Sequence, residues 1–253
     1  MKYYKKMLNL GCFTRDEVVE MVGNSSAANS LIFDYLKKGY IQRVKHNLYV
    51  AISLEDDCPV YNRYQIGSKL FDDAYISHHS SFEVYGIYNQ VYYECYVATK
   101  HRFKDFEFDG IKYCRVEPGK ANDLEETNKI KHTSLEETVI DSIKDCNKLS
   151  DMEEILRCIF MIHKLDEYKM LKILARYNNK FLYQKCGYIF DSIRGYIKLS
   201  DNFFNECKKN MAKTKRYFDK YVSCDTYNQK WNLYVPKYFS NYYDKGVDLN
   251  AME

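Results

Sequence analysis

The stretch TRDEVVEMVGNSSAANSLIFDYLKKGYIQRVKHNLYV, residues 14–50, decides how the N-terminal part of this chain folds. Thr14 and Glu17 have the spacing of a capping box, in which each side chain bonds the other residue's backbone N–H, so a short helix is expected to begin there. Gly23-Asn24 predicts a tight turn at the end of that helix. Residues 1–10 carry apolar side chains at a spacing that fits a preceding helix.

A second, longer helix is expected after the turn. Ser25 or Ser26 would cap it, and Gly39 would stop it just after Lys38, since glycine is favoured beyond a helix end. One face is predicted to be buried and consists of Ala28, Leu31, Ile32, Tyr35 and Leu36. The opposite face carries Ser26, Asn29, Ser30, Phe33 and Lys37.

The apolar period changes from 3.6 to 2 after the second helix. Residues 40–44 and 48–50 therefore predict a short hairpin, with a basic turn at Lys45-His46-Asn47. Helices followed by a β-hairpin in this order are typical of a winged helix-turn-helix, so we predict that fold for this part of the chain.

A winged domain of this kind places the exposed face of its second helix in the major groove of duplex DNA, where small polar side chains approach base edges. The residues expected to approach bases are Ser25, Ser26, Asn29 and Ser30. The residues expected to hold phosphates at the hairpin are Arg43, Lys45 and His46. The alternative interpretation is a small helical domain with a solvated hairpin, used for protein contacts.

The chain is long enough for two or three folded units. It has 253 residues, of which 46% are hydrophobic and only 3 are Pro, a composition typical of packed domains rather than of disorder. We predict an α+β protein with a winged helix-turn-helix over residues 1–55 and a second domain over residues 60–253. That second domain is expected to be mixed α/β over residues 60–145, and mostly helical and basic over residues 146–253.

The net charge of +3 is small, but the charges are unevenly distributed. Residues 1–50 hold 8 Lys/Arg against 4 Asp/Glu, residues 51–145 hold 11 against 18, and residues 146–253 hold 19 against 13. A charge run is usually a solvated face, yet aromatic residues among cations favour a nucleic-acid surface. Both interpretations apply to the run that contains Tyr217, Phe218 and Tyr221, and its candidate DNA-binding residues are Lys208, Lys209, Lys213, Lys215 and Arg216.

The nine cysteines are widely spaced and include no Cys-x-x-Cys pair, so we expect neither a disulfide framework nor a zinc site. The sequence contains no run of 18 apolar residues, and its N-terminus lacks the apolar core of a signal peptide. We therefore expect a cytoplasmic protein in a reducing compartment, without membrane contact.

His78-His79 allows two interpretations. The pair could bind a metal or act in catalysis, with Glu83 within reach of His79 on a helix. It could instead end a strand and lead into a helix capped by Ser80 or Ser81. Adjacent histidines point to different sides of a strand or helix, so the structural interpretation is favoured.

Further local signals mark the rest of the chain. Residues 91–97 alternate as in a half-buried strand, and Asp109-Gly110 predicts a tight hairpin turn. Thr133 and Ser134 each precede a glutamate by three residues, which predicts a helix start. Other helices are expected over residues 152–160, 168–177, 181–193 and 201–211, and residues 231–236 predict a terminal strand or extended arm.

Several segments together resemble the AbiEi family, the antitoxins of type IV toxin–antitoxin systems of abortive infection, which also act as transcriptional repressors. The segments are RVKHNLYV (43–50), ISHHSSFEVYGI (76–87), YVAT (96–99), FDG (108–110) and the Thr-x-Leu-Glu-x-Thr-x-Ile-Asp pattern of residues 133–141. Asn47 stands where many members have glycine, although asparagine also adopts the left-handed conformation that such a turn requires.

The resemblance implies a nucleotidyltransferase-like toxin, encoded beside this gene, which the antitoxin opposes without a stable complex. It also implies that the winged domain binds repeats in its own double-stranded promoter DNA and represses the operon. The alternatives are an enzyme and an interaction protein whose basic C-terminal region holds a protein or RNA partner. The sequence contains no glycine-rich phosphate loop, Cys/His nucleophile pair or metal spacing, so we expect no catalytic residues, no cofactor and no metal.

Overall fold

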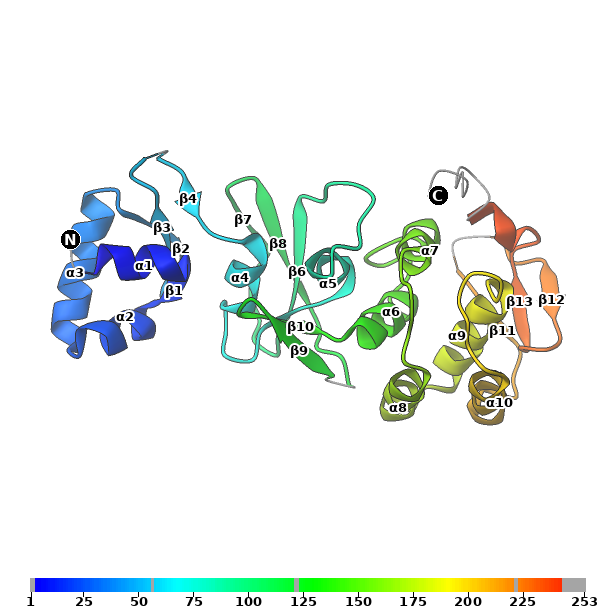
Figure 1. Ribbon diagram of the computed structural model, residues 1–253. Coiled ribbons are helices and arrows are strands. Elements are labelled where there is room, and N and C mark those ends of the chain that lie inside the picture. The colour runs from blue at the N-terminus through cyan, green and yellow to red at the C-terminus, as the bar shows by residue number, and fades with distance from the viewer. Residues whose placement is uncertain (1–2, 56, 121–122, 221–222, 243–253) are drawn as a thin grey trace. The chain divides into compact units, whose positions relative to one another are not determined.

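The computed structural model describes residues 3–55, 57–120, 123–220 and 223–242, which form an α+β fold (Figure 1). The fold class predicted from the sequence is thereby confirmed. Two compact units make up the chain, and each is assembled from separate segments. Unit 1 contains Met1–Ile76, Tyr92–Pro118 and Glu125–His132. Unit 2 contains Ser77–Val91, Gly119–Leu124 and Thr133–Glu253.

The N-terminal part of unit 1 follows the predicted order of helices and hairpin, with one additional short strand. Its elements are α1 (Tyr4–Leu10), β1 (Cys12–Thr14), α2 (Arg15–Val22), α3 (Ser25–Lys37), β2 (Ile41–Lys45), β3 (Leu48–Ile52) and β4 (Pro59–Val60). Strand β3 pairs antiparallel with β1, β2 and β4. Buried side chains from the three helices and from β1, β2 and β3 form one apolar cluster, which holds the helices on this sheet.

Two local features that the sequence predicts are present in this part, the capping box of α2 and the left-handed residue of the hairpin turn. Thr14 Oγ1 accepts the Glu17 N–H at 3.2 Å, and Glu17 Oε2 accepts the Thr14 N–H at 2.7 Å, so the capping box forms. Strands β2 and β3 are joined by only two residues, His46 and Asn47, because Lys45 belongs to the strand. Asn47 has φ 60°, which confirms the left-handed turn position expected for it.

The start of α3 differs from the prediction. Gly23, at φ 80°, ends α2, and the next residue, Asn24, caps α3. Its Oδ1 accepts the Ala27 N–H at 2.9 Å, which satisfies one of the free donors in the first turn. Ser25 and Ser26 were the expected caps, but both lie inside the first turn of α3, so their hydroxyls are not used as caps.

A six-stranded mixed sheet makes up most of the remainder of unit 1. The elements around it are α4 (Arg63–Ser68), β5 (Tyr75–Ile76), β6 (Glu94–Ala98), β7 (Phe106–Phe108), β8 (Ile111–Val116), β9 (Leu124–Thr127) and β10 (Ile130–Thr133). The strand order is β7-β8-β6-β5-β10-β9, and the pairs β6–β8 and β5–β10 are parallel. Asp109 and Gly110, both with positive φ, form the predicted turn between β7 and β8.

The strand predicted over residues 91–97 starts later and is buried on both faces. Strand β6 begins at Glu94, and its last four residues are all buried. Val91 and Tyr93, expected to share its buried face, are 70% and 68% exposed. Helix α4 covers the face that carries Cys95 and Val97, since a Cβ placed on Gly67 would lie 3.0 Å from Val97 Cγ2 and 3.2 Å from Cys95 Sγ. Tyr96 and Ala98, on the other face, are buried as well, so the alternation of a half-exposed strand is lost.

Unit 2 contains most of the helices and a small sheet. Its elements are α5 (His78–Val84), α6 (Leu135–Lys144), α7 (Met152–Phe160), α8 (Glu167–Tyr177), α9 (Lys180–Ser192), α10 (Asp201–Asn210), β11 (Arg216–Tyr217), β12 (Thr226–Asn228), β13 (Leu233–Val235) and the 3₁₀ helix η1 (Phe239–Tyr242). Ser134 caps α6 and Ser200 caps α10, as the sequence predicts. Residues 231–236, expected to form a terminal strand or an extended arm, contain the strand β13, which is the central strand of a sheet with the order β11-β13-β12.

Trp231 anchors the small sheet to α9. Its side chain is fully buried, and its indole N–H donates to Asp191 Oδ2 at 2.9 Å. Gln184 Nε2 donates to the Trp231 carbonyl at 3.1 Å. A Cβ placed on Gly187 would lie 2.1 Å from Trp231 Cζ3, so only glycine leaves room for the indole against this helix.

The compact units do not follow the boundary expected near residues 55–60. The elements from α1 to β4, for which the sequence predicts a winged domain, are called the winged part below. The winged part and the six-stranded sheet belong to the same unit, and polar contacts join them. Lys69 Nζ donates to Glu17 Oε1 at 2.7 Å and to the Cys12 carbonyl at 3.1 Å. Tyr221, named above as part of the basic run, lies outside the described residues.

Candidate nucleic-acid interface

The exposed face of α3 presents the side chains expected to approach bases. Ser26, Asn29 and Ser30 are exposed, and Phe33, one turn further along, is 71% exposed. The opposite face of the helix is fixed because Ala28, Ile32 and Tyr35 lie in the apolar cluster of the winged part. The rotation of α3 about its axis is therefore determined by its core residues, and the polar face is presented to solvent.

Arg15, the first residue of α2, links α2 to α3. Its Nε donates to Asn29 Oδ1 at 2.8 Å, and its Nη2 donates to Ser25 Oγ at 2.6 Å. Its Nη1 lies 3.4 Å from Asp16 Oδ1. A guanidinium offers donors in a fixed planar arrangement, so these contacts hold the Asn29 and Ser25 side chains in place. Sequence reasoning missed Arg15 because it lies 14 positions before Asn29.

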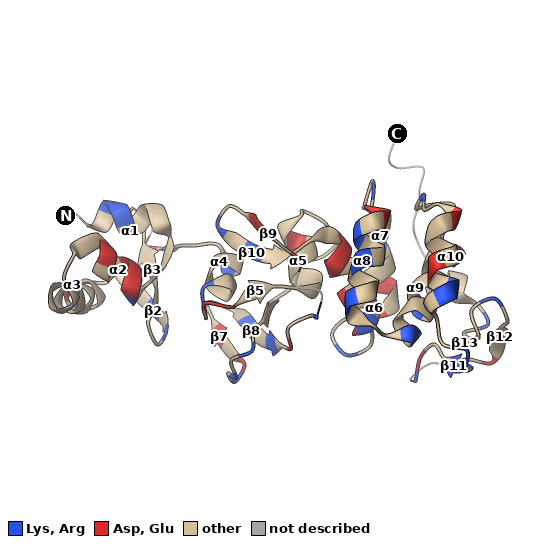
Figure 2. Ribbon diagram, turned by 90° about the horizontal axis from the view of Figure 1, so that it is seen from below, with Lys and Arg blue, Asp and Glu red and all other residues tan. Residues whose placement is uncertain are grey.

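Two of the three predicted phosphate contacts at the hairpin are exposed. Arg43 projects from β2, with its Cζ 5.6 Å from the centre of the Tyr49 ring, and His46 stands in the turn. Figure 2 shows the basic residues at the turn end of β2, whereas α2 carries acidic residues. The turn end of the hairpin is therefore positively charged, and the first strand of this hairpin, β2, follows α3 directly in the sequence.

Lys45, the third predicted phosphate contact, is positioned differently. It is half-buried, and its Nζ lies 4.5 Å from the ring centres of both Phe103 and Phe106. Desolvation by this burial lowers the pKa of Lys45. The cation thus packs on aromatic rings of the six-stranded sheet, a contact between residues about 60 positions apart that the local sequence does not reveal.

The basic cluster expected to bind DNA near the C-terminus belongs to unit 2, not to the unit of the winged part. Lys208 and Lys209 lie in the last turn of α10, and Lys209 pairs with Glu206 at 3.3 Å. Lys213, Lys215 and Arg216 are exposed in and before β11. These five cations therefore lie in α10, in β11 and in the segment between them, and the unit to which they belong does not contain α3.

Ser77, His78 and Asp145 form a buried row that has the residue types of a catalytic triad. Ser77 Oγ lies 3.0 Å from His78 Nδ1, and His78 Nε2 lies 3.4 Å from Asp145 Oδ2. Ser77 is 1% exposed and His78 is 3% exposed, so a substrate has no access to the hydroxyl. Ser77, not the expected Ser80 or Ser81, is the N-cap residue of α5, and the row connects that helix to the end of α6. The burial of His78 and its contacts favour the structural interpretation, in which the histidines lie at the start of a helix and take no part in catalysis.

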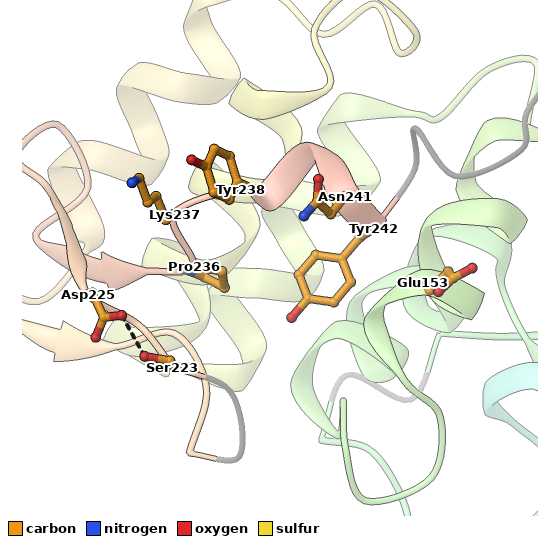
Figure 3. A pocket seen from close by; sticks show the side chains of 8 residues that line it. All are labelled: Glu153, Ser223, Asp225, Pro236, Lys237, Tyr238, Asn241 and Tyr242. Atoms are coloured by element: carbon orange, nitrogen blue, oxygen red, sulfur yellow. Dashed lines mark hydrogen bonds between the residues drawn. The ribbon is translucent and has the colours of Figure 1, made fainter.

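A pocket in unit 2 lies between α7 and the segment around η1 (Figure 3). Its lining residues are Glu153, Ser223, Asp225, Pro236, Lys237, Tyr238, Asn241 and Tyr242. Figure 3 shows Tyr242 pointing into the space that separates Glu153 from Asp225 and Ser223. One lysine faces two carboxylates in this lining, so the pocket lacks the excess of positive charge that a phosphate or nucleic-acid site requires.

The described residues also bear on metal binding, thiol chemistry and membrane association. Among them no group of three or more His, Cys, Asp or Glu side chains is arranged to hold a metal ion. All nine cysteines are free thiols, and burial raises the pKa of Cys12 and Cys186 to about 12, which suppresses the reactive thiolate. Within the described ranges, no helix has both the length and the apolarity to cross a bilayer.

Comparison with known proteins gives a likeness of fold. No protein-family model matches the chain, and no curated protein matches it. Among solved structures, it is similar to the RV2827C protein from Mycobacterium tuberculosis, with a TM-score of 0.58 and 11% sequence identity. The alignment covers 88% of this chain and 85% of that chain, so the likeness shows a shared fold across most of both proteins.

Proposed function

We propose that this protein is a sequence-specific DNA-binding repressor of its own promoter and the antitoxin of a type IV toxin–antitoxin system. The observation that carries the DNA-binding part is the exposed polar face of α3, on which Arg15 holds Asn29 and Ser25 in place. The adjoining hairpin adds Arg43 and His46 as phosphate contacts. The antitoxin part rests on the resemblance of the sequence segments to the AbiEi family.

Arg15 decides which hydrogen bonds Asn29 can offer to a base. The guanidinium N–H donates to Oδ1, which occupies one of the two acceptor sites of this oxygen and holds it toward Arg15. With the amide in this orientation, we propose that Nδ2 is the group that faces DNA. A bidentate contact with adenine requires both atoms of the amide, whereas a donor alone fits a single acceptor such as guanine O6 or N7, adenine N7 or thymine O4. We therefore propose that Asn29 reads one acceptor on a base edge, in place of the bidentate contact that an unrestrained asparagine would make.

The remaining exposed residues of α3 fit the same orientation. Phe33 can contact the methyl group of a thymine, the apolar feature of the major groove. Lys37 lies two turns beyond Ser30 and is exposed for a phosphate. Asp16 and Glu20 give α2 the same sign of charge as the phosphates, which supports placing the backbone contacts on the hairpin and on Lys37.

The test of the DNA-binding part is a titration of the full-length protein against its own upstream DNA and against a scrambled duplex of equal length, at two salt concentrations. We expect selective binding to the upstream DNA, and weaker binding at high salt because phosphate contacts release counterions. Equal and weak binding to both duplexes would contradict the repressor function.

The antitoxin part is tested by expressing the nucleotidyltransferase-like toxin encoded beside this gene, alone and together with this protein. We expect the toxin to arrest growth, the full-length protein to restore it, and no toxin to be retained on the tagged protein during affinity purification. Growth arrest that persists in the presence of this protein would contradict antitoxin activity. Retention of the toxin in stoichiometric amount would instead indicate direct neutralisation.

A second candidate function is that of an interaction protein that holds a partner through its basic C-terminal region. It is favoured by the exposed cations Lys213 and Lys215, which lie before β11 and belong to a compact unit different from that of α3.

A further inference from the structure

The three strands of the small sheet each place one tyrosine at the same level. Tyr217 of β11 pairs with Tyr234 of β13, and Tyr234 pairs with Tyr227 of β12. Directly paired residues in neighbouring strands project on the same face of a sheet. One face of this sheet therefore carries a continuous row of three aromatic rings, which we call the tyrosine row.

The tyrosine row lies on the face turned away from the core of unit 2. Leu233 and Val235 flank Tyr234 along β13, and both are buried in the apolar cluster together with Trp231. Successive side chains of a strand point to opposite faces, so Tyr234 projects on the face opposite to Leu233 and Val235, where it is half-buried and contacts the margin of the cluster. The same alternation, together with the register, places Tyr217 and Tyr227 on the outer face.

The rings of the tyrosine row contact one another and leave one end open. The centres of the Tyr217 and Tyr234 rings are 4.9 Å apart, and the rings are inclined by 18°, which is a stacked arrangement. The Tyr227 ring centre lies 5.1 Å from that of Tyr234, and its hydroxyl donates to Asn232 Oδ1 at 3.0 Å. Tyr217 is 63% exposed although its ring stacks on Tyr234, so the stack can be continued by another flat ring.

Cations accompany the tyrosine row. Lys215 lies two residues before Tyr217, hence on the same face, and its Nζ is 4.6 Å from the centre of the Tyr227 ring. Lys213 is exposed a further two residues before it. Flat rings that accept stacking, with cations at their margin, fit a chain of unpaired bases joined by phosphates.

We propose that the tyrosine row binds single-stranded nucleic acid, with a base stacked on Tyr217 and phosphates held by Lys213 and Lys215. Duplex DNA is excluded as the ligand because the faces of its bases are already stacked on one another. This inference deepens the second candidate function. It does not depend on operator binding, because α3 and the hairpin take no part in it.

The experiment measures the affinity of the full-length protein for labelled single strands of about 12 nucleotides. The probes are oligoadenylate and oligouridylate as RNA, oligoadenylate as DNA, and a duplex of the same length. Tyr217→Ala is expected to weaken binding of the oligoadenylates about tenfold. Tyr217→Phe, which keeps the ring, is expected to bind as the wild type does, and oligouridylate is expected to bind more weakly because pyrimidines stack less well.

A matched control is Tyr168→Ala, which removes a tyrosine that is 75% exposed on α8 and distant from the sheet in sequence. It should leave all affinities unchanged. Lys213→Ala should reduce the dependence of log K on log salt by about 0.7, whereas Tyr217→Ala should leave that slope unaltered, which separates stacking from charge.

The affinities for oligoadenylate as RNA and as DNA show whether the ligand is RNA or single-stranded nucleic acid of either kind. A preference for RNA supports a contact to the 2′-hydroxyl, and equal binding of RNA and DNA supports recognition by stacking and phosphate alone. The proposal is overturned if Tyr217→Ala and Tyr168→Ala bind alike while circular dichroism shows both to be folded, or if the duplex competes as well as the single strands. Binding of the upstream promoter duplex, measured with the same variants, reports on the repressor function separately.

Discussion

Arg15 and Asn29 are joined by a hydrogen bond of 2.8 Å between Nε and Oδ1, although 14 residues separate them in the sequence. The bond joins α2 to α3 and fixes the orientation of an amide at the centre of the exposed face of α3. An arginine at the start of α2 thereby determines what an asparagine of α3 can recognise. With this bond in place, Asn29 is proposed to offer a single donor to DNA, whereas the sequence of α3 alone suggests a contact through both atoms of the amide.

The Arg15–Asn29 pair predicts a change of base preference. Asn29→Ala should cost about 0.5–1.5 kcal/mol at one base position of the operator, because a single hydrogen bond is lost. Arg15→Ala should free Asn29 Oδ1 and shift the preference at that position toward adenine, which can then be read by both amide atoms. Binding to a set of operators substituted at each position measures both effects.

The control for this pair is Asn9→Ala, which removes an exposed asparagine on α1. It should leave the preference at every position unchanged. An unaltered preference in both Asn29→Ala and Arg15→Ala would show that this face of α3 does not read the operator.

The hairpin cations should differ in their response to salt. Arg43→Ala is expected to reduce the slope of log K against log salt by about 0.9, the value for one phosphate contact on duplex DNA. Lys45→Met should leave that slope unchanged, because Nζ of Lys45 is already placed on the rings of Phe103 and Phe106. Titrations of the operator at several salt concentrations give the slopes. Equal reductions in the two variants would mean that Lys45 leaves the rings and meets a phosphate.

Gly187 is closely packed against Trp231, so we predict that adding a single methyl group at this position lowers the stability of the protein. Gly187→Ala would place a Cβ 2.1 Å from Trp231 Cζ3 and 2.4 Å from Cη2, so the indole or the helix must shift. We expect a decrease of about 1–3 kcal/mol in the free energy of unfolding, as for other overpacked cores. Gly195→Ala is the matched control, since no heavy atom lies within 4 Å of the Cβ that it adds. Urea denaturation followed by circular dichroism compares them, and equal midpoints would contradict the packing described here.

The lowered pKa of the Asp145 carboxyl is expected to make the stability of the protein depend on pH. Burial alone would raise the pKa of its carboxyl, but hydrogen bonds from His78, Lys144 and Lys148 outweigh burial and hold the pKa well below its usual range. Because the pKa is lower in the folded state than the unfolded value of about 3.9, the stabilisation is present above that pH and is lost as the pH falls below it.

Asp145→Asn should therefore be less stable than the wild type near neutral pH, and the difference should shrink as the pH falls below about 4. Asp201→Asn, which alters a carboxylate that is 85% exposed, is the control and should show a smaller change at both pH values. Urea midpoints at the two pH values test this. A difference between wild type and Asp145→Asn that stays constant with pH would exclude the role assigned to this carboxylate.

The local features of the fold could be predicted from the sequence because their causes lie within a few residues. The capping box at Thr14, the left-handed Asn47 and the Asp109-Gly110 turn depend on spacing and backbone preference, and the structure has each of them. The cap of α3 was displaced by one residue because asparagine and serine are almost equivalent at that position.

The features that sequence reasoning missed depend on contacts between distant segments. The burial of β6 on both faces depends on other segments that cover the sheet, α4 among them, and the position of Lys45 follows from rings almost 60 residues away. Tyr217 was recognised as an aromatic residue within a basic run, but its register with Tyr234 and Tyr227 depends on a sheet that the pattern did not predict.

The burial of Trp231 supplies a spectroscopic reporter for one half of the molecule. It is the only tryptophan of the chain, it is fully enclosed, and it belongs to unit 2. Its fluorescence emission should therefore shift to longer wavelength when unit 2 loosens and stay constant when unit 1 alone melts. Far-ultraviolet ellipticity, by contrast, sums the helices of both units, so a heating curve in which the two signals separate would mean that the winged part and the tyrosine row can be lost one without the other.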